Sequence, residues 1–504
     1  MPVNPAQFNG ATGMFSRGTR VALALFLAYA AAQALLRVAV SESLELDEAE
    51  QVLLAQHWAW GYGGQPPLYT WLQAALFAAL GTNVAAVALL KALLVFAVLG
   101  LTYRAVREIT DSETIAFAAA AAWFLLPHFA WEARRDLSHT VLALVAVVAV
   151  IFFAARWHMR PGVTASLGLG MSAAVGVLSK YNFLLFLAAF GLAALSLRPM
   201  RASLRDARLL PGLILFLGIT GAHGAWFVTH LELATSGHQK LLVPDAAGRV
   251  QASLLGLASL LVQGAPALLL LAAVCWACSL RRAIPGVPTP AASLWQSLLA
   301  RTLIFGVALC GVLAIVMQMR FKARWLLPLF GVAPLYAALW VHRRAGERRV
   351  QWLARAGSAT ALVMLFALPA ATLLASITGK LRRHNAPYAA LINQVKPHAA
   401  SPDLILAGNR LVGGNVKLFY PASRVVVPEL AAPPIPNWSR CLVVWDATRQ
   451  AEMPPALSAL VSRFCNAGAT AFQPQYVEAT QKYTRTRTMR LGLVVLSADC
   501  TQVR

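Results

Sequence analysis

Five carboxylates stand close together near the start of the chain, ahead of aromatic residues and a proline-rich turn. The segment SESLELDEAEQVLLAQHWAWGYGGQPPLYTWL spans residues 41–72 and contains no lysine or arginine. It includes Asp47, Glu48, His57, Tyr62 and Gln65. A carboxylate here could remove a proton from an attacking nucleophile. The alternative is a solvated acidic loop next to an aromatic belt at a membrane surface.

Other segments carry the opposite charge. Lys322 and Arg324 fall within MRFKARW, and Lys180 stands between two apolar runs. Basic side chains of this kind can hold an anionic group such as a phosphate, so we expect four phosphate-binding candidates. These are Lys91, Lys180, Lys322 and Arg324. Lys91 and Lys180 have an alternative role, in which the ammonium extends to the headgroup region while the stem stays in the apolar layer.

The composition indicates which elements must position these residues. Hydrophobic residues make up 59% of the 504 residues and charged residues only 12%, with a mean hydropathy of +0.62. Soluble domains carry about 25% charged residues, so we expect a polytopic α-helical membrane protein. The net charge of +23 then reflects cationic loops near anionic lipid, and nucleic acid is not an expected partner.

Apolar runs predict eleven membrane spans. A further run over 66–80 is short and opens with two prolines, so we expect it to be interfacial or re-entrant. The predicted spans are 19–40, 84–107, 114–131, 138–155, 164–179, 181–197, 209–229, 252–279, 302–318, 324–341 and 356–377.

The distribution of basic residues predicts the orientation of these spans. With the N-terminus inside and 66–80 not crossing, the inner loops hold eighteen lysines and arginines and the outer loops eight. Such a bias is typical of membrane proteins. The acidic loop over 41–83 and the segment after residue 379 are then outside, on the same side as all the polar candidates except Lys91, which falls within a span.

Residues 380–504 differ from the rest and predict a small external α/β domain, separate from a membrane domain over 1–379. Short β-type runs DLILAG, SRVVVP, CLVVWDA and LGLVVLS alternate with helical stretches such as PALSALVSRF. Cys441, Cys465 and Cys500 lie in this segment, where either one bridge or three free thiols are expected. Cys275 and Cys278 lie in an apolar span and are expected to be small buried residues.

Four motifs in this order resemble the GT-C glycosyltransferases of the protein-mannosyltransferase and aminoarabinose-transferase type. They are Asp47-Glu48 followed by WAWGYGGQPPL, then Arg135-Asp136, then GVLSKY over 176–181, then FKARWLLP over 321–328. The resemblance covers roughly residues 20–345. It implies a GT-C fold and an enzyme that moves a sugar from a polyprenyl-phosphate carrier to an acceptor outside the cytoplasm, with inversion.

The resemblance also implies roles for individual residues. Asp47 would be the catalytic base, with Glu48 the next choice, and Asp136 would help to arrange the site. Lys322 and Arg324 would hold the leaving phosphate, with Lys180 as a further candidate. Substrate-binding residues would be His57, Tyr62, Gln65, Tyr181 and Trp325. Many relatives have His or Lys before the two prolines, whereas this chain has Gln65, which cannot carry charge.

The sequence leaves the identity of the substrates open. The acceptor could be a glycolipid or other lipid, a glycan or a protein, and the bacterial inner membrane with a periplasmic site is the expected location. No cofactor is evident, although two acids in one site could hold a divalent cation. A transporter or flippase of lipid or glycan, and an inactive assembly protein, are the competing hypotheses; charges at the outer ends of spans, rather than at mid-membrane, argue against transport.

Overall fold

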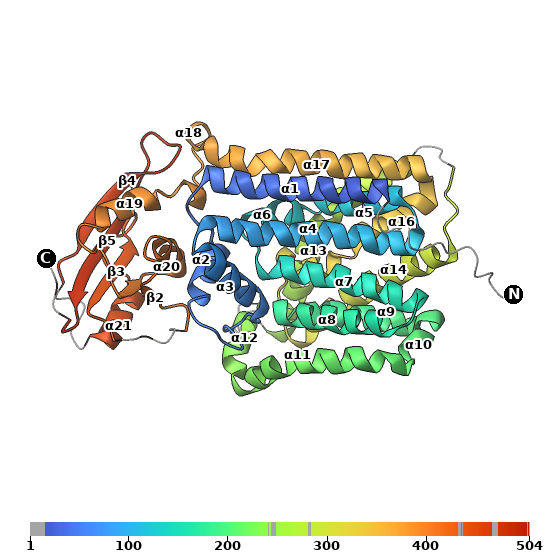
Figure 1. Ribbon diagram of the computed structural model, residues 1–504, viewed down its shortest axis with the longest axis horizontal. Coiled ribbons are helices and arrows are strands. Elements are labelled where there is room, and N and C mark those ends of the chain that lie inside the picture. Colours follow the sequence, from blue (N-terminus) through green and yellow to red (C-terminus); the bar gives the residue numbers. More distant parts are fainter. Residues whose placement is uncertain are drawn as a thin grey trace.

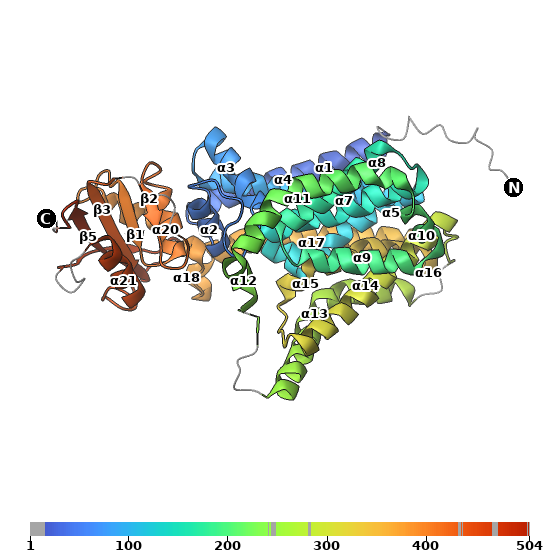
Figure 2. The same cartoon turned by 90° about the horizontal axis from the view of Figure 1, so that it is seen from below.

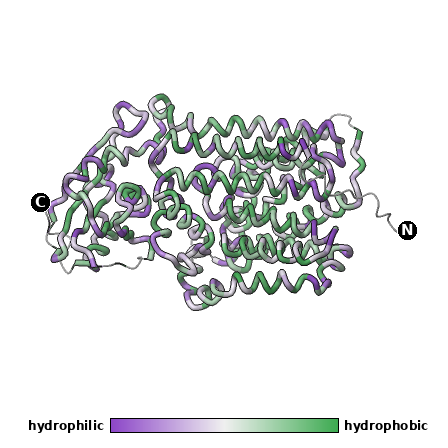
Figure 3. Tube along the Cα trace, viewed as in Figure 1, coloured by the Kyte–Doolittle hydropathy of each residue, from purple (hydrophilic) through white to green (hydrophobic). Residues whose placement is uncertain are grey.

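The computed structural model describes residues 16–239, 241–242, 248–280, 284–431, 435, 437–465, 472–500 and 502. It is a bundle of helices with a smaller α/β domain at one end (Figure 1). The long helices are hydrophobic, whereas hydrophilic residues gather at the bundle ends and in the α/β domain (Figure 3).

The elements of the bundle are α1 (Arg17–Val40), α2 (Leu46–Leu54), α3 (Leu68–Leu80), α4 (Val84–Thr110), α5 (Glu113–Ala121), η3 (Ala122–Leu125), η4 (His128–Glu132), α6 (Ala133–Arg135), α7 (His139–Met159), α8 (Val163–Ser179), α9 (Phe183–Ser196), α10 (Arg198–Leu204), η5 (Ala207–Leu209), α11 (Leu210–Thr229), α12 (Leu231–Gln239), α13 (Arg249–Ser279), α14 (Pro290–Val316), α15 (Ala323–Phe330), α16 (Ala333–Ala345), α17 (Glu347–Leu373) and α18 (Ala375–Thr378).

The predicted spans correspond to helices of this bundle. Within the described residues, seven helices are long and apolar enough to cross a membrane, and three bent pairs raise the number to ten. The bent pairs are Glu113–Leu125 with His128–Arg135, α9 with α10, and α15 with α16. The eleventh predicted span is α8, which has 17 residues and is shorter than the other apolar helices that cross alone.

The first loop between spans forms two short helices at the end of the bundle. α3 has 13 residues and is therefore about 20 Å long, less than the roughly 30 Å of a hydrocarbon core. Figure 2 shows α3 and α2 at the end of the bundle that faces the α/β domain. Gly63 has a φ of +68° in the turn between them, a conformation that favours glycine.

The α/β domain begins with η6 (Arg383–Asn385) and α19 (Tyr388–Val395) and contains one mixed sheet. Its strand order is β2-β1-β3-β5-β4, with β1 parallel to β2 and β3, and β5 antiparallel to β3 and β4. The elements are β1 (Leu404–Ala407), α20 (Arg410–Lys417), β2 (Arg424–Val426), β3 (Arg440–Asp446), α21 (Pro455–Phe464), β4 (Gln475–Thr480) and β5 (Thr488–Ser497).

The four predicted strands and the predicted helix over PALSALVSRF are present, and β4 is an additional strand. β4 was missed because its sequence, QYVEAT, is mostly polar at a sheet edge. Cys465 and Cys500 form a disulfide bond, while Cys441 is free and buried. Cys275 and Cys278 are free and buried, as expected for small residues inside a span.

Candidate active site

A cavity of about 1230 Å³ opens between the first loop, the ends of several spans and the α/β domain. Nine of the twelve predicted site residues line it. They are Asp47, His57, Tyr62, Gln65, Lys180, Tyr181, Lys322, Arg324 and Trp325. Residues separated by up to 278 positions along the chain thus share one space.

Asp47 is held in the first turn of α2 by two backbone interactions. Glu45 precedes the helix, and its backbone N–H donates to Glu48 Oε2 at 3.0 Å, which closes a capping box. The backbone N–H of Asp47 donates to Asp136 Oδ1 at 2.9 Å. The Asp136 side chain therefore orients the first turn of α2 from behind, and it does not line the cavity itself.

The surroundings of Asp47 favour its protonated form near neutral pH. Burial raises its pKa to about 7, with the negative charges of Asp136 and Glu50 adding to the effect and Arg324 and Lys180 opposing it. Two carboxylates and two cations thus act on the charge of Asp47. A general base works best with a pKa near the operating pH.

Glu48 occupies a different environment from its neighbour, and this corrects its role as the next candidate base. Its side chain is fully buried, with Arg37 Nη2 at 2.8 Å and Lys91 Nζ at 2.8 Å from its two oxygens. Burial alone would raise the pKa of Glu48, but the charges of Arg37 and Lys91 outweigh it and hold the pKa well below its usual range. The carboxylate is a structural anion that ties α2 to α1 and α4.

The same ion cluster corrects the expectation for Lys91 as a phosphate ligand. Its side chain is 3% exposed, and its ammonium donates to Glu48 and to the carbonyl of Arg135 at 3.1 Å. Lys91 does not line the cavity. Its position in an apolar run gave no indication of the buried carboxylate opposite.

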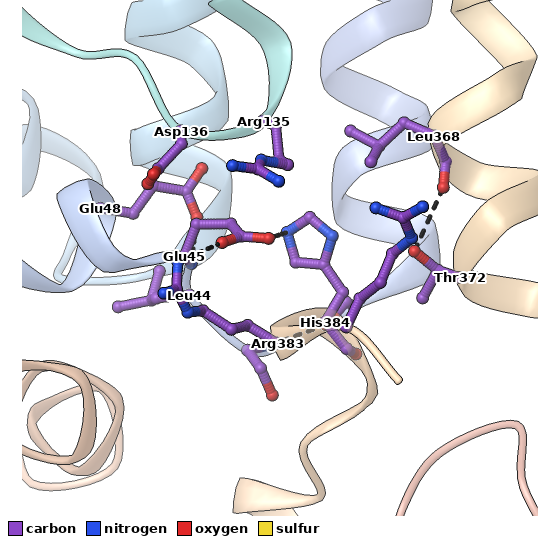
Figure 4. Close-up of polar contacts among 12 residues, drawn as sticks. Leu44, Glu45, Glu48, Arg135, Asp136, Leu368, Thr372, Arg383 and His384 are labelled. Carbon is purple, nitrogen blue, oxygen red and sulfur yellow. Dashed lines mark hydrogen bonds and ion pairs between the residues drawn. The ribbon is translucent and has the colours of Figure 1, made fainter. Parts of the chain in front are cut away.

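Glu45 extends this cluster toward the α/β domain, as Figure 4 shows. Arg383 Nη1 lies 3.0 Å from one oxygen of Glu45, and His384 Nε2 lies 3.9 Å from the other. Burial, with the nearby positive charge of Arg37, lowers the pKa of His384 to about 3. His384 is therefore neutral and Arg383 supplies the positive charge.

Four cationic side chains line the cavity, and three of them, Lys180, Lys322 and Arg324, come from the helix bundle. In the part of the chain that the structure describes, no carboxylate forms an ion pair with Lys180, Lys322 or Arg324. Lys180 donates to Thr140 Oγ1, and burial together with Arg324 lowers its pKa to about 8, while Asp47 opposes this. Such cations can hold an anionic ligand.

The turn before the two prolines is organised by Tyr62. Its hydroxyl donates to the carbonyl of His57 at 2.8 Å and accepts from the backbone N–H of Ala59 at 3.0 Å. The backbone N–H of Tyr62 donates to the carbonyl of Gln65. The ring of His57 packs edge-on against Tyr62, and burial lowers the pKa of His57. The three residues form one wall of the cavity.

A second wall contains residues that the sequence did not indicate. The ring of Tyr181 stacks on that of His223, with centroids 5.8 Å apart, and His223 Nδ1 lies 2.6 Å from the carbonyl of Trp60. Asn182 Nδ2 donates to the carbonyl of Trp325. Only the polarity of His223 within the apolar run over 209–229 could have suggested it.

The α/β domain also reaches the cavity, through Arg410, Glu429, Leu430 and Ala431. The guanidinium of Arg410 is ion-paired with Glu50, which lies one turn after Asp47 on α2. In the described part of the chain, no three His, Cys, Asp or Glu side chains are grouped to hold a metal ion.

Comparison with known proteins identifies the family of the chain. The family described as dolichyl-phosphate-mannose-protein mannosyltransferase matches residues 64–226. The lipopolysaccharide core galacturonosyltransferase RgtA of Rhizobium johnstonii is 30% identical over 472 residues, which cover 90% of this chain and 92% of RgtA. RgtB of the same organism is 31% identical over 483 residues, covering 92% and 94%. The chain belongs to the GT-C superfamily of membrane glycosyltransferases.

The GT-C fold is also found in the structural comparison. ArnT from Cupriavidus metallidurans bound to undecaprenyl phosphate superposes with a TM-score of 0.60 at 13% identity, covering 95% of this chain and 98% of ArnT. The apo state gives a TM-score of 0.61 at the same identity, covering 95% and 99%. At this identity the likeness concerns the fold, and it extends over the helix bundle and the α/β domain of this GT-C glycosyltransferase.

Proposed function

We propose that this GT-C glycosyltransferase moves a sugar from a polyprenyl-phosphate donor to a hydroxyl group of a glycolipid acceptor. The observation that carries the proposal is the arrangement of one cavity, with the carboxylate of Asp47 facing Lys180 and Arg324. An acceptor hydroxyl needs a base, and a departing phosphate needs positive charge. The cavity supplies both at the outer ends of apolar helices, where a polyprenyl chain can remain in the membrane.

The proposed reaction is a single displacement. Asp47 accepts the proton of the acceptor hydroxyl while its oxygen attacks the anomeric carbon of the donor. The bond between that carbon and the phosphate oxygen breaks, and its electron pair leaves with the phosphate. Lys180, Lys322 and Arg324 stabilise the charge that builds on the phosphate, and attack from the opposite face inverts the anomeric centre.

The charge of the cavity supports a donor sugar with a carboxylate. Three cations without ion-paired carboxylates exceed what a single phosphodiester requires, and a uronic acid would add a second negative group. RgtA and RgtB are both described as galacturonosyltransferases of the lipopolysaccharide core. We therefore assign a galacturonosyl donor and a lipopolysaccharide-core acceptor as the substrates to test.

The same proposal includes a site that faces the periplasm from the bacterial inner membrane. Eighteen basic residues in one set of loops against eight in the other support this orientation. The disulfide between Cys465 and Cys500 is in keeping with an oxidising compartment. Lipopolysaccharide-type glycolipids would reach the cavity from the outer leaflet.

The direct test uses purified protein in liposomes with undecaprenyl phosphate carrying labelled galacturonic acid, and a lipopolysaccharide core as acceptor. Labelled acceptor and free undecaprenyl phosphate are the expected products, and Asp47→Asn should form both about 10²–10⁴-fold more slowly. A matched donor carrying galactose measures the contribution of the carboxylate. Movement of the labelled donor across the bilayer without a covalent product would replace the proposal with transport.

A further inference from the structure

The α/β domain forms part of the cavity wall. Its residues can therefore contact a substrate, which the sequence of the domain does not indicate. Arg410 begins α20, and Glu429, Leu430 and Ala431 follow β2; all four line the same cavity as Asp47. At about 1230 Å³ the cavity exceeds the 300–1,000 Å³ of a typical site for one small ligand. It therefore has room for an acceptor group beside the donor sugar.

Arg410 is fixed in position by contacts on both of its sides. Its backbone N–H donates to Glu429 Oε2 at 2.6 Å, and Asn409 caps α20 by accepting from the backbone N–H of Val412 at 3.0 Å. Its guanidinium Nη1 contacts Glu50 Oε2, and the side chain of Arg410 is 26% exposed. The ion pair with Glu50, which also lines the cavity, thus keeps the guanidinium of Arg410 beside the cavity.

The packing of α20 on α2 keeps this position constant. Asn415 Oδ1 accepts from the backbone N–H of Leu44 at 2.8 Å, immediately before α2 begins. Gly414 lies so close to Ala49 that an added Cβ would stand 2.5 Å from the Ala49 Cα. Because the two helices touch through backbone, Arg410 and Asp47 keep a fixed separation.

We propose that Arg410 binds an anionic group, phosphate or carboxylate, of the acceptor. This inference rests on the proposed glycosyl transfer and adds the acceptor side of the same site. Glu50 follows Asp47 by three residues, a rise of about 4.5 Å along α2, so its ion pair with Arg410 lies one turn from the base. The guanidinium carries five N–H donors in a planar fork and can hold an acceptor oxyanion while keeping its contact with Glu50.

The two proposed anion-binding regions belong to different domains. Lys180, Lys322 and Arg324 come from the outer ends of the spans, beside the membrane where a polyprenyl phosphate resides. Arg410 comes from the α/β domain at one end of the helix bundle (Figure 1), on the side where the head of a glycolipid would stand. The acceptor hydroxyl next to its anionic group is then presented to Asp47 from the side opposite the donor.

The experiment compares Arg410→Ala with Arg463→Ala, which removes an exposed arginine on α21 that does not line the cavity. Arg410→Ala should raise the KM for the lipopolysaccharide core about 10- to 100-fold, with kcat within about threefold and donor affinity unchanged. Arg463→Ala should match the wild type. Arg410→Lys should recover part of the acceptor affinity, because it retains the charge without the fork.

Two modified acceptors identify the anionic group. A core treated with phosphatase and a core whose carboxylates are amidated should each be used with wild type and Arg410→Ala. The group that Arg410 binds is the one whose removal raises the wild-type KM and leaves the KM of Arg410→Ala unchanged. If neither treatment distinguishes the two proteins, the proposal is wrong.

Two further outcomes would contradict it. A loss of donor affinity in Arg410→Ala would place the arginine on the donor side. The other outcome is an unchanged acceptor KM in Arg410→Ala, together with a shift of the acidic side of its pH–rate profile to higher pH. This result would mean that Arg410 acts only by neutralising Glu50. Binding of the labelled core to detergent-solubilised protein without donor separates this inference from the transfer itself: binding that depends on Arg410 in a protein that transfers no sugar would leave the inference intact and refute the proposed function.

Discussion

Asp47 and Glu48 are adjacent acidic residues with opposite electrostatic environments. Successive residues on a helix point about 100° apart, so Asp47 faces the cavity while Glu48 faces the buried ammonium and guanidinium groups of Lys91 and Arg37. The sequence could identify the pair but not the different environments of its two members, because Arg37 and Lys91 belong to two other helices whose packing against α2 is a tertiary contact.

The pH dependence of transfer should report the state of Asp47. Its pKa is raised from 3.8 to about 7, so a base that must be deprotonated loses about tenfold in rate for each pH unit below 7. Asp47→Asn should cost about 10²–10⁴-fold at pH 8. Initial rates between pH 5 and 9 measure both effects.

The stability of Asp47→Asn is the control for that experiment. A carboxyl group with a raised pKa in the folded state binds its proton more tightly there than in the unfolded chain, so it destabilises the protein as pH rises through about 7. The variant should therefore be at least as stable as the wild type at pH 8. A variant that is both inactive and less stable at pH 8 would contradict this account of Asp47.

The three cavity cations should differ from general lipid-binding charges. A specific phosphate contact is worth about 1.5–3 kcal/mol, so we expect donor affinity to fall about 10- to 100-fold in at least one of Lys322→Ala and Arg324→Ala. Loss of Arg324 should be the more damaging, since its planar guanidinium can bind two phosphate oxygens. The positive charge of Arg324 also lowers the pKa of Asp47. Titration of the donor in detergent is the measurement, and equal, salt-sensitive losses would indicate lipid attraction alone.

At the scale of elements, α2, which carries Asp47, is held from outside the membrane domain. α2 lies within the acidic segment over 41–72 and ends at Leu54, and α20 of the α/β domain packs against it. No feature near residue 410 indicates this docking, because the partner surface lies some 360 positions earlier in the chain.

Gly414→Ala tests whether this docking positions the site. The added methyl would meet the Cα and carbonyl oxygen of Ala49 at 2.5 Å, and backbone atoms cannot move aside cheaply. We expect a loss of about 1–3 kcal/mol in stability and a fall in kcat, since α20 must shift away from α2. Thermal unfolding and initial rates measure this. Gly191→Ala on α9, where an added Cβ meets nothing within 4 Å, should change neither.

For the whole molecule, hydropathy predicted most of the architecture. Long apolar runs are unambiguous because a bilayer requires them, and each corresponds to a helix or a bent pair. For the cavity, the sequence predicted only which polar residues lie on the same side of the membrane. The burial of Lys91 against Glu48, outside the cavity, and the position of Arg410 in the cavity wall were not predictable, since both depend on contacts between distant segments.

Cysteine labelling tests the proposed orientation. Pro161 lies between α7 and α8, and Arg485 is exposed in the α/β domain. With an impermeant reagent, Arg485→Cys should react in intact spheroplasts, whereas Pro161→Cys should react only after lysis. The four free cysteines are buried and provide a low background. The reverse pattern would invert the topology and move the cavity to the cytoplasm.

The internal place of β5 in the sheet determines when the enzyme becomes competent. β5 is the last of the described strands along the chain, yet it lies between β3 and β4, so the sheet stays incomplete until residues 488–497 have been synthesised. The domain that packs on α2 is therefore finished after the described spans have been synthesised. A nascent chain whose spans are already in the bilayer still lacks the support of α20 for α2, and we expect transfer activity only after the α/β domain has folded.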